Sequence, residues 1–120
     1  MATFTKNKLS GSTDGLAVKV TGTSTAATVT VHTAVAGTTA GVFDEIWLYA
    51  NNTSTSAVKL TLEWGTATAA DGNIELTIAA EAGLVLVVPG LILQNAKVVK
   101  AFAGTADVIL LSGFVNSITA

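Results

Sequence analysis

Residues 43–64 read FDEIWLYANNTSTSAVKLTLEW, and this stretch decides the fold class. Ile46 and Leu48 point to one side of its first half, and Trp47 points to the other. A period of two is typical of β-strands, and the second half of the stretch alternates in the same way. Because the residues between the two runs, 51–56, are short and polar, we predict a β-hairpin with a long tip.

Similar short runs recur along the chain, separated by turn residues. We expect further strands at 17–21, 27–33, 73–78, 84–88, 97–103 and 108–118, the last interrupted by a bulge or bend at Ser112-Gly113. Regular spacing without an amphipathic helix predicts an all-β protein. The expected architecture is an antiparallel β-sandwich of about eight strands, either jelly-roll or immunoglobulin-like.

The chain is expected to hold one domain, residues 16–120, preceded by a flexible N-terminal arm at residues 1–15. The arm is polar and rich in Ser and Gly, so it would either fray or lie on a neighbouring subunit. Within the domain, residues 84–88 are continuously apolar, and Pro89-Gly90 is predicted to end that strand in a turn. Such a strand should be covered on both faces, by its own loops or by a partner.

Composition excludes several classes of function. Only 12% of the residues are charged, against about 25% in an ordinary soluble domain, so part of the surface is expected to contact partners. Arg is absent and the net charge is −2, which disfavours nucleic-acid binding. The chain has no Cys and no signal-like N-terminus, and its longest apolar run has ten residues, too short to cross a membrane. We therefore expect a soluble protein made without export.

Few residues suggest reaction chemistry. His32 is the only histidine, and with no second group placed beside it we expect a surface or interface histidine. Asp44 and Glu45 are expected to be solvated at the start of a strand, because no acid-rich loop follows that would hold calcium.

Glu63 and Glu75 lie on the polar faces of two strands that we expect to be neighbours. A pair of carboxyl groups across a cleft is the arrangement that glycoside hydrolysis requires. Carboxyl groups on strand faces more often point to solvent, and Lys59 offers Glu63 a charge partner. We therefore predict no enzyme activity and assign no catalytic, metal-binding or cofactor-binding residue.

Five segments carry a resemblance to a known group of proteins: LEWGT at 62–66, IELTI at 74–78, GLVLVVPGL at 83–91, VKAFA at 99–103 and GFVN at 113–116. Over residues 43–118 the chain resembles small β-sandwich virion proteins of tailed bacteriophages. This group includes capsid decoration, or cement, proteins and small tail or fibre modules. The resemblance implies a trimer or dimer on the capsid surface of a virion, bound to the major capsid protein.

These expectations name candidate contact residues. For self-association they are Leu84, Val85, Val87 and Leu91, and for capsid contact Phe4, Lys6 and Lys8. The alternative function is a glycan-binding or structural module of a tail fibre or spike. Its candidate glycan contacts are Trp47, Tyr49, Asn51 and Asn52, because aromatic rings stack on sugars and the polar loop is adjacent.

Overall fold

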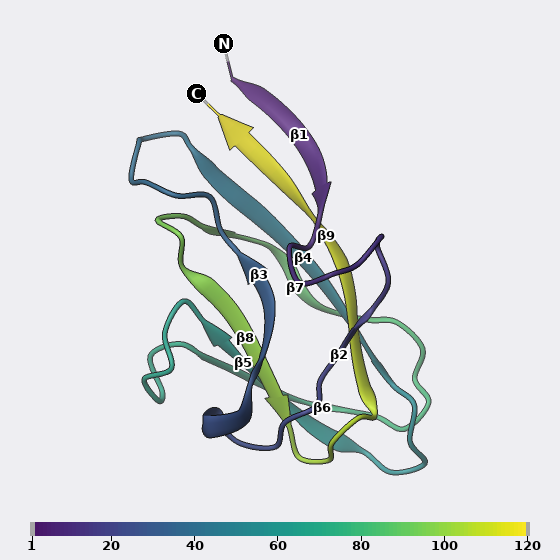
Figure 1. The fold of residues 1–120 in the computed structure, drawn as a ribbon. Helices are drawn as coiled ribbons and strands as arrows, with labels where there is room; N and C mark the ends of the chain where they lie inside the picture. Colours follow the sequence, from purple (N-terminus) through teal and green to yellow (C-terminus); the bar gives the residue numbers. More distant parts are fainter. Residues whose placement is uncertain (1, 120) are drawn as a thin grey trace.

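The computed structural model describes residues 2–119 and shows two antiparallel β-sheets packed face to face (Figure 1). The strands are β1 (Thr3–Lys8), β2 (Val18–Lys19), β3 (Val29–Thr33), β4 (Phe43–Asn52), β5 (Val58–Trp64), β6 (Asn73–Ile78), β7 (Val85–Leu93), β8 (Val98–Ala103) and β9 (Ile109–Thr119). One 3-10 turn, η1 (Thr25–Ala27), precedes β3. The predicted all-β sandwich is confirmed.

The strand pairings are nested. Sheet A has the order β1-β9-β4-β7, with β2 also paired to β9, and sheet B has the order β3-β8-β5-β6. Thus β1 and β2 pair with β9, β3 with β8, β4 with β7, and β5 with β6. A chain that pairs in this way is one long antiparallel ladder rolled into two layers, which is the jelly-roll arrangement and not the immunoglobulin one.

The expected hairpin at residues 43–64 is wrong. β4 belongs to sheet A and β5 to sheet B, so the two strands pack across the core and do not pair along an edge. The connection between these strands, the β4–β5 arch, is stabilised by the Asn52 side chain. Its amide donates to the carbonyl oxygens of Ser56 (2.9 Å) and Ile78 (3.0 Å). The hairpin in this region is β5–β6, in continuous register from Val58↔Ile78 to Glu63↔Asn73.

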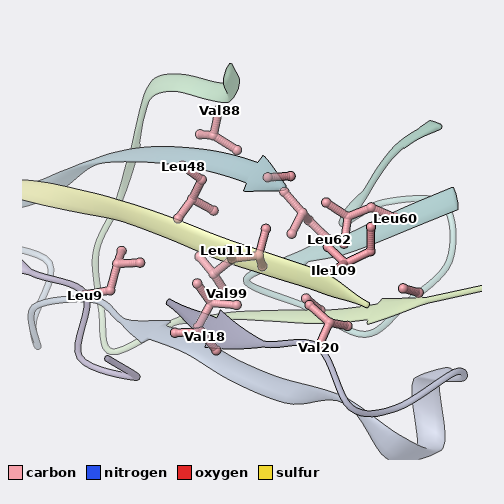
Figure 2. Packing of buried hydrophobic residues seen from close by; sticks show 14 of the residues in the cluster. Leu9, Val18, Val20, Leu48, Leu60, Leu62, Val88, Val99, Ile109 and Leu111 are labelled. Carbon is pink, nitrogen blue, oxygen red and sulfur yellow. The ribbon is translucent and has the colours of Figure 1, made fainter. Parts of the chain in front are cut away.

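The core lies between the sheets and is filled by the alternate residues of each strand. Figure 2 shows Leu48, Val88 and Leu111 of sheet A in one cluster with Leu62 and Val99 of sheet B. All five side chains are fully buried. The side chains between them on each strand therefore face outward, as the alternation predicts.

The N-terminal segment is not a flexible arm. β1 pairs with β9 over six residues, from Thr3↔Thr119 to Lys8↔Phe114, and Leu9 is buried in the core. The reason is that β9 extends beyond β2 and offers a free edge, which β1 completes (Figure 1). Met1 lies outside the described residues.

β7 also differs from expectation. It runs on through Pro89 and Gly90 to Leu93, and it is the last strand at one edge of sheet A. An edge strand tolerates proline, and two register shifts against β4 absorb the irregularity. Only Val88 in this strand is fully buried, whereas Leu84, just before it, and Leu86 are exposed, so the chain itself does not cover both faces.

β9 is continuous, and the predicted bulge at Ser112-Gly113 is absent from its register with β4. Gly113 is needed for another reason: a Cβ there would collide with the backbone oxygen of Trp47. Within residues 2–119 no helix is long and apolar enough to span a membrane.

Candidate functional site

The outer face of sheet A, turned away from sheet B, gathers residues from four strands. Cross-strand register places them in rows: Phe4, Ile118 and Phe43; Lys6, Asn116, Glu45 and Ile92; Lys8, Phe114, Trp47 and Pro89; Ser112, Tyr49 and Leu86. The structure thus brings the three predicted capsid contacts and the two predicted aromatic glycan contacts onto one surface.

Trp47 lies at the centre of this face and is held on two sides. Its ring is stacked near Phe114, with centroids 6.0 Å apart and planes 11° apart. On the other side it lies against the backbone of Gly90, where a Cβ would be 3.0 Å from the ring. Lys6 Nζ lies 4.3 Å from the centroid of the Phe114 ring, a cation–π contact that extends the row to β1. The aromatic centre is therefore fixed in place.

Glu45 provides the negative charge beside these rings. Its Oε1 accepts hydrogen bonds from Trp47 Nε1 (2.8 Å) and from Asn116 Nδ2 (3.0 Å). Both bonds favour the charged form and lower the pKa of Glu45, and burial opposes them only weakly. At neutral pH the face therefore combines aromatic rings with a fixed carboxylate and lysine charges at its β1 edge.

The two asparagines of the predicted glycan site separate. Asn51 is half-buried and lies on the Trp47 side of β4, opposite Leu110. Asn52 is fully buried, and its side-chain oxygen accepts from the backbone N–H of Ser54 (3.0 Å). Because the amide group of Asn52 already holds the β4–β5 arch, assigning it to glycan contact is wrong.

The predicted self-association residues are only partly available. Leu84 and Leu91 are exposed, at 66% and 44%, whereas Val85 and Val87 are half-buried and pack against the core. Sequence reasoning missed Leu86 and Ile92, which are exposed at 45% and 55%. Both lie at even spacing from Leu84, so alternation along the strand places them on its side. The register shifts in β7 break this pattern at two other positions, because Val88 is buried and Leu91 is exposed.

His32 and Asp44 are both buried, contrary to expectation. A register shift between Thr30 and His32 turns both Val31 and His32 inward, whereas Asp44 lies on the same inward side of β4 as Ile46 and Leu48. The Ser10 N–H donates to His32 Nδ1 (3.0 Å), so the hydrogen of the ring is on Nε2, which donates to Asp44 Oδ2 (2.8 Å). Ser117 Oγ donates to Asp44 Oδ1 (3.0 Å).

This arrangement is not a nucleophilic triad. Ser117 contacts the carboxyl group and not the imidazole, and the acceptor nitrogen of His32 is already occupied by a backbone N–H. The network instead joins the segment after β1 to β3, β4 and β9, so its role is structural. Among residues 2–119, no three His, Cys, Asp or Glu side chains gather as metal ligands.

The two glutamates of the hydrolase hypothesis occupy different environments. Glu63 is 2% exposed, on the outward side of β5, and its Oε2 accepts from Thr25 Oγ1 of η1 (2.6 Å). Glu75 is exposed and forms an ion pair with Lys59, so the expected Lys59–Glu63 pair and the solvated Glu63 are both wrong. The strands are neighbours as predicted, but the glutamates do not face each other across a cleft.

Comparison of the chain with known protein families, with curated proteins and with solved structures finds no match. The fold and the site define a jelly-roll β-sandwich with one aromatic outer face. The function is argued below from that geometry.

Proposed function

We propose that this chain is a non-enzymatic virion structural protein, a capsid decoration (cement) protein that binds the outer surface of a phage head. There it would contact the major capsid protein and stabilise the contacts between capsid subunits. One observation carries the proposal. Among the described residues, the exposed large hydrophobic side chains are Phe4, Leu16, Leu84, Leu86, Leu91 and Ile92, and all but Leu16 lie on β1, on β7 or directly before β7. Exposed apolar surface is therefore concentrated on sheet A.

The outer face of sheet A has the composition of a protein-binding surface. Trp, Tyr and Phe are enriched in interface centres, and charged groups lie at the rim. Here Trp47 and Phe114 occupy the centre, and Lys6 and Lys8 lie at the β1 edge. Because Trp47 is already fixed by Gly90 and by its bond to Glu45, little side-chain entropy is lost when a partner binds.

The β7 edge is the proposed self-association surface. β7 has no charged residue, whereas the β1 edge carries Lys6 and Lys8 and the β6 edge carries Glu75. The β3 edge is covered, because Gly11 N–H donates to the Val31 carbonyl oxygen (2.9 Å). Charges and covering segments protect sheet edges from pairing, and β7 relies only on Pro89 and its register shifts. Residues 84–88, before that proline, are therefore free to contact a second copy.

Binding to heads tests the proposal. Purified protein mixed with empty heads of the source phage should co-sediment, and Trp47→Ala should weaken binding about 30-fold or more, the usual cost of losing a central aromatic anchor. Glu75→Gln, on the opposite sheet, should bind like the wild type. If the wild-type protein does not sediment with heads, the proposal is wrong.

Oligomeric state tests the β7 contact separately. Light scattering after size-exclusion chromatography should show a dimer or trimer for the wild-type protein. Leu86→Lys should shift it towards monomer, because a charge on an edge strand opposes pairing. Thr77→Lys on the β6 edge is the matched control and should leave the oligomer intact. A wild-type monomer would exclude this contact.

A second candidate function is the glycan-binding or structural module of a phage tail fibre or spike. It is favoured by the Trp47 ring, which lies against Gly90 beside the polar groups of Glu45 and Asn116, as a sugar-stacking ring would. Glycan-array binding that Trp47→Ala abolishes would support it. The copy number per particle separates the two functions, since a decoration protein is present in hundreds of copies and a fibre module in a handful.

A further inference from the structure

Glu63 is the buried polar side chain whose hydrogen bonding is incomplete. Its Oε2 is bonded to Thr25, but Oε1 has no hydrogen-bond partner within residues 2–119. An unpaired buried carboxyl oxygen is costly, and in a native protein such an atom requires an explanation, such as a bound water, an ion or a functional role.

Two hollows on the outer side of sheet B share Glu63 and Ala67 in their linings. The first, of about 200 Å³, is lined by Glu63, Thr66, Ala67, Val98 and two lysines, Lys97 and Lys100. The second, of about 320 Å³, is lined by Thr23, Thr25, Asn73 and Phe102 as well as Glu63. The first hollow is smaller than a typical drug-sized site and suits a ligand of about one sugar ring.

The first hollow places two lysines beside the carboxyl group of Glu63. Lys100 lies directly opposite Glu63 in the β5–β8 register, yet neither it nor Lys97 forms an ion pair with any described residue. Beside Glu63, whose Oε1 is shielded from solvent, the hollow is therefore lined by two lysines without an ion-pair partner among the described residues and by the apolar side chains of Ala67, Ala96 and Val98.

We propose that this hollow binds an acidic saccharide unit, a sugar ring that carries a carboxylate. The ligand carboxylate pairs with Lys97 and Lys100, a ring hydroxyl donates to Glu63 Oε1, and the C–H face of the ring lies on the alanines and Val98. A cationic ligand fits poorly because the two lysines repel it. A metal ion lacks ligands, since among residues 2–119 Glu63 is the only carboxyl group in the lining of either hollow.

Glu63 Oε1 is shielded from solvent, so the ligand reaches it when the β5–β6 connection moves. Residues 66–71 of that connection are exposed, and Ala67 lines both hollows. Binding should therefore change the environment of residues 65–72 together with that of Lys97 and Lys100.

Titration with D-glucuronate, followed by ¹H–¹⁵N NMR, tests the proposal. The expected result is saturable shifts of the amides of residues 65–67 and 97–100, with glucose binding about tenfold more weakly or less because it has no carboxylate. Added salt should weaken glucuronate binding. Glu63→Gln and Lys100→Met should each weaken it about tenfold or more, with dispersed spectra that show an intact fold.

Glu75→Gln is the matched control, because it removes a glutamate from the same sheet face outside the first hollow, and it should bind glucuronate like the wild type. Absence of saturable shifts, equal affinity for glucose, or unchanged binding by Glu63→Gln would overturn the proposal. Shifts at Trp47 and Phe114 alone would place sugar binding on sheet A and would likewise overturn it. None of these results bears on head binding by sheet A, so the two proposals fail independently.

Discussion

Asp44 and Glu63 are both buried carboxyl groups, at 4% and 2% exposure, and they differ in how completely they are hydrogen-bonded. Asp44 accepts from His32, Ser117 and the Val35 backbone N–H (3.1 Å). Glu63 accepts one bond, from Thr25, and its second oxygen has none among the described residues. A complete network stabilises the fold, whereas an incomplete one marks a position that stability alone does not explain.

The position of each group in the jelly roll accounts for the difference. Asp44 points inward from β4, where β3 and β9 supply donors from both sheets. Glu63 points outward from β5, and within the part of the chain that the structure describes only η1 supplies a donor to it. The loss of stability on removing a carboxyl group should therefore increase with the number of buried donors that it satisfies.

Of the carboxyl substitutions, Asp44→Ala should lower the free energy of unfolding the most. The substitution leaves donors of His32, Val35 and Ser117 buried without an acceptor, so we expect a loss of about 3–4 kcal/mol in the free energy of unfolding. Urea denaturation followed by circular dichroism measures it. Asp71→Ala, in an exposed turn, is the control and should change stability by less than about 0.5 kcal/mol. A loss below about 1 kcal/mol for Asp44→Ala would show that the network is not structural.

The double substitution Glu63→Met with Thr25→Val should have a much smaller effect. It removes the unpaired oxygen together with the bonded pair, and apolar replacement of both partners of a hydrogen bond is nearly neutral. We expect the free energy of unfolding to stay within about 1 kcal/mol of the wild-type value. A loss above about 2 kcal/mol would mean that Glu63 is as fully bonded as Asp44, and the contrast between them would fail.

Glu45 lies between these extremes, half-buried and bonded to Trp47 and Asn116. Because these bonds lower its pKa in the folded state, its stabilising effect is present above the ordinary glutamate pKa and is lost as pH falls through the lowered value. The Trp47 indole N–H resonance should titrate with a midpoint below that of an ordinary glutamate. Asn116→Ala should move the midpoint upward, and an unchanged midpoint would contradict the assigned cause.

The sequence predicts which residues share a strand face but not what covers that face. Alternation placed Ile46 and Leu48 opposite Trp47 correctly, because a period of two is a local property. It did not reveal that β4 and β5 belong to different sheets, since both pairings are compatible with the same alternation.

For the buried polar residues, too, the local sequence does not reveal what covers them. His32 is buried because of one register shift in β3, and Glu63 is covered by a segment 38 residues earlier in the chain. Neither feature has a local sequence signal. The sequence suggests the candidate contacts on β1 and at Trp47 from their residue types, but only the register with β9 places them on one surface.

Substitution of Glu75 should change the free energy of unfolding the least, and it is therefore the reference for the other carboxyl substitutions. It is an exposed partner of Lys59, with side chains 42% and 60% exposed, so solvent screens the ion pair. We expect Glu75→Gln to change the free energy of unfolding by about 0.5 kcal/mol or less. Urea denaturation at low and at high salt measures it, and the difference from the wild type should vanish at high salt. A larger, salt-independent loss would mean that the outer side of sheet B is less solvated than its exposed residues indicate, and Glu63 would then lie in a wider polar network.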